Sequence, residues 1–252
     1  MTVQTVEQPR IPAQIRAALA GPGRRDPAAF AELLATARRE SGLKADAENP
    51  RSSATGLFQF TEQTWLDLVR QKGAKYGLAE LAKKIGRDPA TGKNEVASPE
   101  DRQKILALRK DPKVAAAMAG ELNAQNRKSL NAALGREPTY QELYAAHFLG
   151  ARGAVRLIQA AEQTPETPSN RLMPVAAKAN KGVFRDAETR RYRTAGELAR
   201  HLDVASAGPA GRASPSGAEY LDGLAPARSV APVHSAQLQA QLAASSTEGW
   251  GT

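Results

Sequence analysis

The stretch that decides the fold is residues 27–60, which read PAAFAELLATARRESGLKADAENPRSSATGLFQF. Asp26 is a typical helix N-cap, and Pro27 suits the first helical position that follows it. Apolar residues then recur at helical spacing: Phe30, Leu33, Leu34 and Ala37. This period predicts an amphipathic helix that ends near Ser41 and buries one face against a core.

Glu40 lies at the C-terminal end of this predicted helix. At 100° per residue it falls almost above Leu33, on the edge of the apolar stripe, whereas Arg39 falls on the opposite, solvated face. Burial and the negative end of the helix dipole both disfavour a charged carboxylate there. Both effects favour the protonated form that a general acid needs near neutral pH. The alternative is an ordinary surface glutamate at a helix end.

The residues after Glu40 form a composite motif. Glu-Ser ends the helix at 40–41, Asn-Pro lies in the loop at 49–50, and Ser-x-x-Gly-Leu-x-Gln follows at 53–59. This order and spacing resemble the catalytic core of the soluble lytic transglycosylase (SLT) family, which has a helical fold similar to that of goose lysozyme. The local resemblance covers about 35 residues, and a weaker one continues to about residue 204.

The resemblance implies a role for each matching residue. Glu40 would be the single catalytic acid and base, and Ser41 would pack behind it and help to fix the carboxyl. Ser53 and Gln59 match positions that line the glycan groove of the family. The side-chain amide of Gln59 suits this role, because it offers both a donor and an acceptor to an N-acetyl sugar.

A second landmark of the family is a helix that ends in Ala-Tyr-Asn-Ala-Gly. The corresponding segment here is 142–150, which reads ELYAAHFLG. Counting back from Gly150 places His147 where the family has its tyrosine. Tyr144 lies one helical turn earlier on the same face and could supply the hydroxyl instead. The sequence therefore offers two candidates, His147 and Tyr144, for the second residue of the site.

The rest of the chain predicts a mainly α fold, and the resemblance makes it a lysozyme-like, SLT-type helical domain. The predicted domains are an N-terminal segment 1–24 with a short helix at 13–19 that stops at Gly21, the SLT-like domain 25–204, and a tail 205–252. Further helices are expected at about 61–73, 99–110, 112–134, 139–149, 151–162, 171–181 and 194–202. Thr194 and Glu197 have the spacing of a capping box. Residues 182–184 could form a short strand with Tyr192.

The tail differs in composition from the remainder of the chain. Ala, Gly, Pro and Ser make up 29 of its 48 residues, so it cannot bury enough apolar surface to order itself. It is expected to be disordered. A short stretch at 234–244 has helical spacing, and it is either a transient helix in a linker or a docking segment for a secretion, flagellar or phage-tail protein.

Composition excludes several classes of site. The chain has no Cys and three widely spaced His residues, which argues against disulfides and against a metal site, and no cofactor is implied. The net charge of +9 suggests a polyanionic partner. No basic recognition helix or base-stacking motif indicates nucleic acid, and no run of about 18 apolar residues indicates a membrane span.

The resemblance to the SLT family implies a lytic transglycosylase that cleaves the MurNAc–GlcNAc β-1,4 bond of peptidoglycan and forms 1,6-anhydroMurNAc. Ordinary glycosidases need two carboxylates, and only Glu40 lies in a recognisable motif. The alternatives are a hydrolytic muramidase on the same fold and a non-catalytic glycan-binding or scaffold module. The expected place of action is the periplasm or cell envelope. The N-terminal residues lack the pattern of a signal peptide, so another export route is expected.

Overall fold

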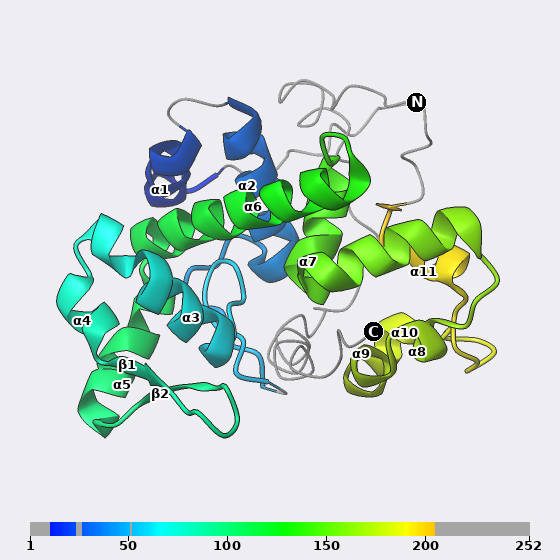
Figure 1. The fold of residues 1–252 in the computed structure, drawn as a ribbon. Helices are drawn as coiled ribbons and strands as arrows, with labels where there is room; N and C mark the ends of the chain where they lie inside the picture. Colours follow the sequence, from blue (N-terminus) through cyan, green and yellow to red (C-terminus); the bar gives the residue numbers. More distant parts are fainter. Residues whose placement is uncertain (1–10, 24–26, 51, 205–252) are drawn as a thin grey trace, which may run out of the picture.

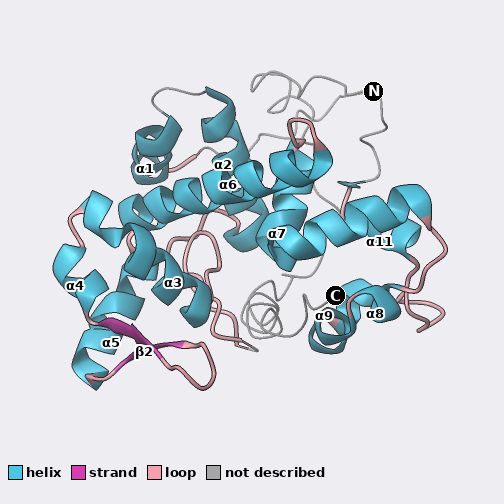
Figure 2. Ribbon diagram, viewed as in Figure 1, coloured by secondary structure: helices cyan, strands magenta, loops and turns pink. Residues whose placement is uncertain are grey.

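The computed structural model describes residues 11–23, 27–50 and 52–204. These residues are mainly helical, which confirms the prediction of a mainly α fold (Figure 1, Figure 2). The predicted N-cap at Asp26 and the predicted disordered tail at 205–252 lie outside the described residues.

The first half of the chain builds a helical unit with a small β-hairpin. Its elements are α1 (Ala13–Gly23), α2 (Pro27–Ser41), α3 (Glu62–Lys72), the 3₁₀ helix η1 (Gly73–Tyr76), α4 (Ala79–Lys83), β1 (Ile85–Arg87), β2 (Asn94–Val96), α5 (Pro99–Ala107) and the 3₁₀ helix η2 (Leu108–Lys110). Side-chain oxygens cap several of these helices, since Thr61 accepts the N–H of Thr64 before α3 and Ser98 accepts that of Asp101 before α5.

The second half consists of two long helices followed by short ones. Its elements are α6 (Pro112–Leu134), α7 (Tyr140–Gln163), α8 (Ser169–Leu172), α9 (Pro174–Ala179), α10 (Lys181–Phe184) and α11 (Ala195–His201). The expected break between 139–149 and 151–162 is present, because Gly150 has φ 72° and ψ 157° and kinks α7. The capping box of Thr194 and Glu197 is confirmed at the start of α11.

The core has two main parts, and α6 contributes buried side chains to both of them (Figure 1). The first part joins α1, α2, α3 and the first half of α6, with Ile15, Leu33 and Trp65 almost fully buried. The second joins α7 to the short helices after it. A smaller cluster of Ala35, Tyr140 and Tyr144 joins α2 to α7. The helix α1 is therefore part of the same core as α2 and does not form a separate segment.

Four local predictions differ from the structure. The helix expected at about 171–181 is divided into α8, α9 and the start of α10, because Met173 and Asn180 have non-helical backbone angles. α1 continues to Gly23 instead of stopping at Gly21, since Pro22 packs against Gly120 of α6. Residues 182–184 are helical, and only Arg185 bridges to Tyr192. The hairpin β1–β2 was not expected, because strands of three residues are too short for a pattern of alternation to appear.

Candidate active site

Glu40 is the last but one residue of α2, and it is buried. Its residue exposure is 6%, and that of its side chain is 2%. The cause is the helical period, since Leu33 and Ala37 on the same stripe are also buried in the core. The expectation that this carboxyl faces the interior is therefore correct, and the interpretation as an exposed glutamate at a helix end is wrong.

Burial raises the pKa of Glu40 from 4.5 to about 7. A hydrogen bond from Tyr144 and the charge of Arg39 lower the pKa, but burial outweighs both. Within the part of the chain that the structure describes, Oε1 of Glu40 has no hydrogen-bond partner. A carboxyl with these properties is about half protonated at neutral pH and can both give and take a proton.

The first half of α7 lies beside Glu40 and brings two aromatic side chains to it. Nε2 of His147 is 3.8 Å from Oε1 of Glu40, and the side chain of Tyr144 is hydrogen-bonded to the Glu40 carboxyl. The rings of Tyr144 and His147 are stacked with their centroids 6.3 Å apart. The two candidates for the second position are therefore both present, one helical turn apart on one face of α7.

His147 is held neutral in this setting. Burial lowers the pKa of His147 from 6.5 to about 4, and a hydrogen bond with the backbone of Phe58 acts in the opposite direction. The side chain is 6% exposed. At neutral pH the imidazole thus offers a hydrogen bond to its surroundings without placing a cation beside Glu40.

The start of α7 is fixed strongly enough to hold these side chains in place. Thr139 and Glu142 form a capping box, and Glu142 is almost fully buried. Arg136 binds both carboxylate oxygens of Glu142, at 2.6 and 2.8 Å. A bidentate ion pair to a buried carboxylate restricts movement, so it helps to fix the position of the helix start that precedes Tyr144 and His147.

Arg39 differs from its expected position on the solvated face. Its guanidinium carbon lies 3.9 Å from the centroid of the Tyr144 ring, in cation–π contact, and the residue is only partly exposed. Tertiary packing of α7 against the end of α2 covers a helix face that the period alone would leave in water. Arg39 is thus a cation of the site, and one of the groups that lower the pKa of Glu40.

Ser41 connects the end of α2 to the following loop. Its hydroxyl contacts the carbonyl oxygens of Ala37 at 3.0 Å and Leu57 at 2.8 Å. The residue therefore holds the segment behind Glu40 in place through backbone groups. A direct hydrogen bond between Ser41 and the carboxyl is not found among the described residues.

Gln59 is buried and braces the loop from within. It has φ 49°, and its Nε2 donates to the carbonyls of Ala47 and Gly56, both at 3.1 Å. Both amide hydrogens are therefore used inside the loop, which leaves no donor for a sugar in this conformation. Ser53 is exposed, and its hydroxyl accepts a long hydrogen bond from the N–H of Glu62 at 3.4 Å. Neither side chain is hydrogen-bonded to Glu40 in the described ranges.

Sequence reasoning missed two residues near the site. Tyr140 lies one turn before Tyr144, its hydroxyl is 3.5 Å from that of Thr36, and burial raises its pKa to about 12. Arg109 of η2 is buried and binds the loop that carries Gln59. The helical period of α7 could have indicated Tyr140, whereas no local signal distinguishes Arg109 from the other basic residues.

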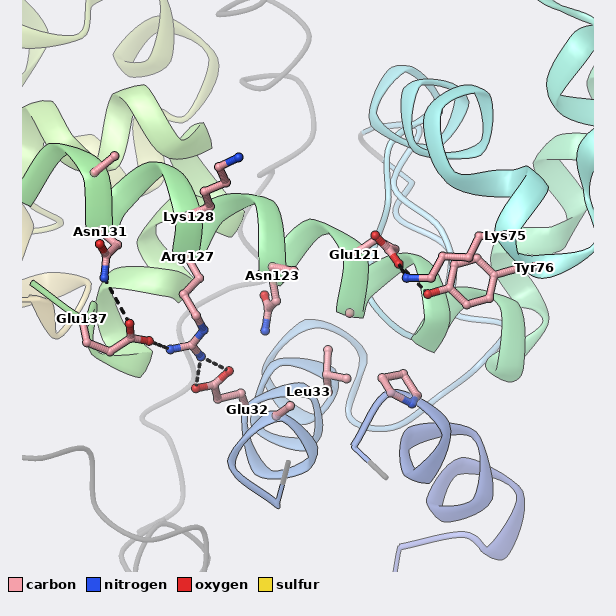
Figure 3. A pocket seen from close by; sticks show the side chains of 15 residues that line it. Glu32, Leu33, Lys75, Tyr76, Glu121, Asn123, Arg127, Lys128, Asn131 and Glu137 are labelled. Carbon is pink, nitrogen blue, oxygen red and sulfur yellow. Dashed lines mark hydrogen bonds and ion pairs between the residues drawn. The ribbon is translucent and has the colours of Figure 1, made fainter. Parts of the chain in front are cut away.

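A separate groove of about 710 Å³ lies between α1, α2, η1 and α6 (Figure 3). Glu40 is not among its lining residues. Arg127 of α6 reaches across it to Glu32 of α2 at 2.7 Å and also pairs with Glu137. Because Arg127 joins α6 to Glu32 of α2, we interpret its contacts as a brace between these two helices.

Two further features concern metals and membranes. Across residues 11–23, 27–50 and 52–204, no group of three or more His, Asp or Glu side chains could hold a metal ion. No helix in these ranges is long and apolar enough to cross a membrane.

The sequence was compared with models of known protein families, and none of them matches it. Function is therefore inferred from the motif around Glu40 and from the geometry of its neighbours.

Proposed function

We propose that the protein is a lytic transglycosylase with a lysozyme-like, SLT-type domain, acting on peptidoglycan in the cell envelope. The observation that carries the proposal is one buried carboxyl, Glu40, with a pKa of about 7, at the position that the Glu-Ser motif indicates. Tyr144 and His147 beside it provide polar contacts from a second helix.

Among the described residues, no second carboxylate is found beside Glu40, which favours transglycosylation over hydrolysis. Two-carboxylate glycosidases place both groups around the scissile bond. Two carboxylates close to Glu40 in the sequence are used elsewhere, since Glu48 pairs with Lys110 and Glu62 pairs with Arg102. No carboxylate is among the groups that shift the pKa of Glu40.

The chemistry needs one proton and returns it. Glu40 donates its proton to the glycosidic oxygen as the bond from C1 of MurNAc breaks, and the acetamido oxygen of the sugar stabilises the positive charge at C1. The Glu40 carboxylate then takes the proton of the C6 hydroxyl, whose oxygen attacks C1. The product is a 1,6-anhydro ring, no water is consumed, and Glu40 regains its proton.

Substrate access requires a movement in this scheme. The side chain of Glu40 is only 2% exposed, so a glycan can reach the carboxyl only if neighbouring groups move aside. The same closure keeps water away from the carboxyl and from the reaction intermediate, which favours attack by the C6 hydroxyl over attack by water.

Digestion of purified peptidoglycan, followed by mass spectrometry of the sugar ends, tests the proposal. We expect anhydro-muramic ends, one water lighter than reducing ends, and a loss of about 10²–10⁴-fold in rate for Glu40→Gln. Glu48→Gln is the matched control, because it makes the same chemical change at an exposed glutamate nearby. It should retain normal activity.

Each alternative gives a different result. Reducing muramic ends as the main product would identify a hydrolytic muramidase. Binding to glycan without cleavage would identify a non-catalytic module. If Glu40→Gln retained more than about a tenth of the activity, Glu40 would not be the acid.

A further inference from the structure

Arg109 is a buried cation that binds backbone carbonyls. The residue is 8% exposed. Its Nη1 donates to the carbonyls of Ser53 at 2.5 Å and Phe60 at 3.1 Å, and its Nε donates to that of Leu106 at 3.0 Å. Among the described residues no carboxylate forms an ion pair with it. The guanidinium thus ties together the two ends of residues 53–60, which we call the site loop.

A buried charge is costly, so its use here needs a structural reason. Burial lowers the pKa of Arg109, and the charges of Glu62 and Glu48 oppose this effect from a distance, whereas its hydrogen bonds go to carbonyl groups. A planar guanidinium presents donors in a fixed fork and can bind two converging carbonyls at once, which an apolar side chain cannot do. This geometry fits a residue whose task is to hold two loop ends in one arrangement.

The backbone of Arg109 also contacts the site loop. A Cβ placed on Gly56 would lie 2.0 Å from the carbonyl oxygen of Arg109, and Gly56 has φ 83°. The loop therefore lies directly against η2 at its middle and is bound by the Arg109 side chain at both ends. These contacts fix its position relative to η2.

The site loop contacts two neighbours of Glu40, namely Ser41 and His147. The carbonyl of Leu57 accepts from Ser41, the residue next to Glu40. The backbone of Phe58 is hydrogen-bonded to His147, whose Nε2 lies 3.8 Å from the Glu40 carboxyl. The Phe60 ring contacts the His147 ring, with centroids 6.3 Å apart. A shift of the loop would therefore displace both Ser41, which follows Glu40 in the chain, and His147, which faces the Glu40 carboxyl.

We propose that Arg109 is a positioning residue for Glu40, which acts by holding the site loop closed around the carboxyl. Its importance for catalysis rests on the proposed function, but its effect on the loop does not. Loosening of the loop admits water to Glu40, and the protonated carboxyl is then favoured less. The groups facing Glu40 are Arg39 of α2 and Tyr144 and His147 of α7, and a substitution of Arg109 replaces none of them.

The test compares Arg109→Met with Arg102→Met in the full chain. Arg102 is an exposed arginine of α5 that pairs with Glu62, so its replacement leaves the site loop intact. The first readout is hydrogen exchange of the amides of Thr55 and Gln59, which bond within the loop. For Arg109→Met we expect exchange about 10- to 100-fold faster, as for the loss of hydrogen bonds from a charged donor. The amide of Leu198 in α11 should be unchanged.

The second readout is the pH titration of the Glu40 carboxyl by ¹³C NMR, assigned with Glu40→Gln. We expect the midpoint to fall from about 7 toward 4.5, by at least about one pH unit. With active protein, kcat should fall and its basic limb should move to lower pH, whereas KM should change little. Arg102→Met should leave all these values unaltered.

Unchanged exchange in the loop, or an unchanged Glu40 midpoint, overturns the proposal even if thermal stability falls. Neither readout needs catalysis, so a protein that does not cleave peptidoglycan still tests it. If Arg109→Met does not fold, Arg109→Lys is measured instead. Lysine keeps the positive charge but lacks the planar guanidinium with its fork of donors, so we expect smaller changes in the same two readouts. Wild-type values for both readouts would contradict the role of Arg109.

Discussion

Glu40 and His147 should give the protein opposite and compensating dependences of stability on pH. The two side chains lie 3.8 Å apart, and burial shifts the pKa of both. Between pH 4.5 and 6.5 the two effects should nearly cancel, so this pair should change the free energy of unfolding of the wild type little with pH. Each single substitution, Glu40→Gln and His147→Gln, should reveal the contribution of the other residue.

The magnitudes follow from linkage. The pKa of Glu40 is raised from 4.5 to about 7, so the unfolded chain ionises first and stability falls as pH rises through this window. At about 1.4 kcal/mol per pH unit, the total is about 3 kcal/mol. The pKa of His147 is lowered from 6.5 to about 4, so stability is lost as pH falls through that window, also by about 3 kcal/mol.

Urea unfolding followed by circular dichroism at several pH values between 4 and 8 measures these contributions. The free energy of unfolding of Glu40→Gln, relative to that of wild type, should increase by about 3 kcal/mol as pH rises from 4.5 to 8. His147→Gln should gain about the same as pH falls from 7 to 4. A constant offset from altered packing does not affect this comparison, and an unchanged m-value confirms that the unfolded state is comparable.

The opposite result would refute the reasoning. If the pair were a buried ion pair of Glu40 carboxylate and His147 imidazolium, Glu40→Gln would leave an unpaired buried cation. The variant would then lose stability relative to wild type near neutral pH instead of gaining it. A pH profile of Glu40→Gln parallel to that of wild type would show that the carboxyl is not desolvated.

Two further predictions concern single groups of the site. Tyr144→Phe removes a hydrogen bond that lowers the pKa of Glu40, so the Glu40 titration seen by NMR should move to higher pH, by up to about one unit, and a downward shift would contradict this. Gly56→Ala should lose at least about 2 kcal/mol in urea unfolding, because a Cβ would meet the carbonyl of Arg109 at a positive φ. Gly42→Ala is its control, since Gly42 has a positive φ but open space around it; an equal loss would exclude the clash as the cause.

Regular helices were predictable because their signals are local. Capping by Thr194 with Glu197, and the break at Gly150, depend on residues within one turn and are present as expected. The hairpin β1–β2 was missed because its strands are three residues long, and its place depends on contacts such as Gln63 with Asn94, 31 residues apart.

The candidate site was predictable only in part. The helical period placed Glu40 on the buried stripe, and the motif selected it among the glutamates. The expected partner on α7 was left as a choice between Tyr144 and His147, and packing brings both to the carboxyl. The family resemblance places Gln59 in the groove, but in the structure both hydrogens of its amide are used by the loop.

The sequence by itself determined most of the longer helices and the buried side of α2, because periodicity and capping act over a few residues, and its motif indicated the residue that the proposed chemistry needs. Only the tertiary structure decided how acidic that residue is. The pKa of Glu40 depends on its burial and on its neighbours, of which Tyr144 and His147 come from 104 and 107 positions away in the sequence. Desolvation is a property of everything packed around a group, so no local pattern can encode it.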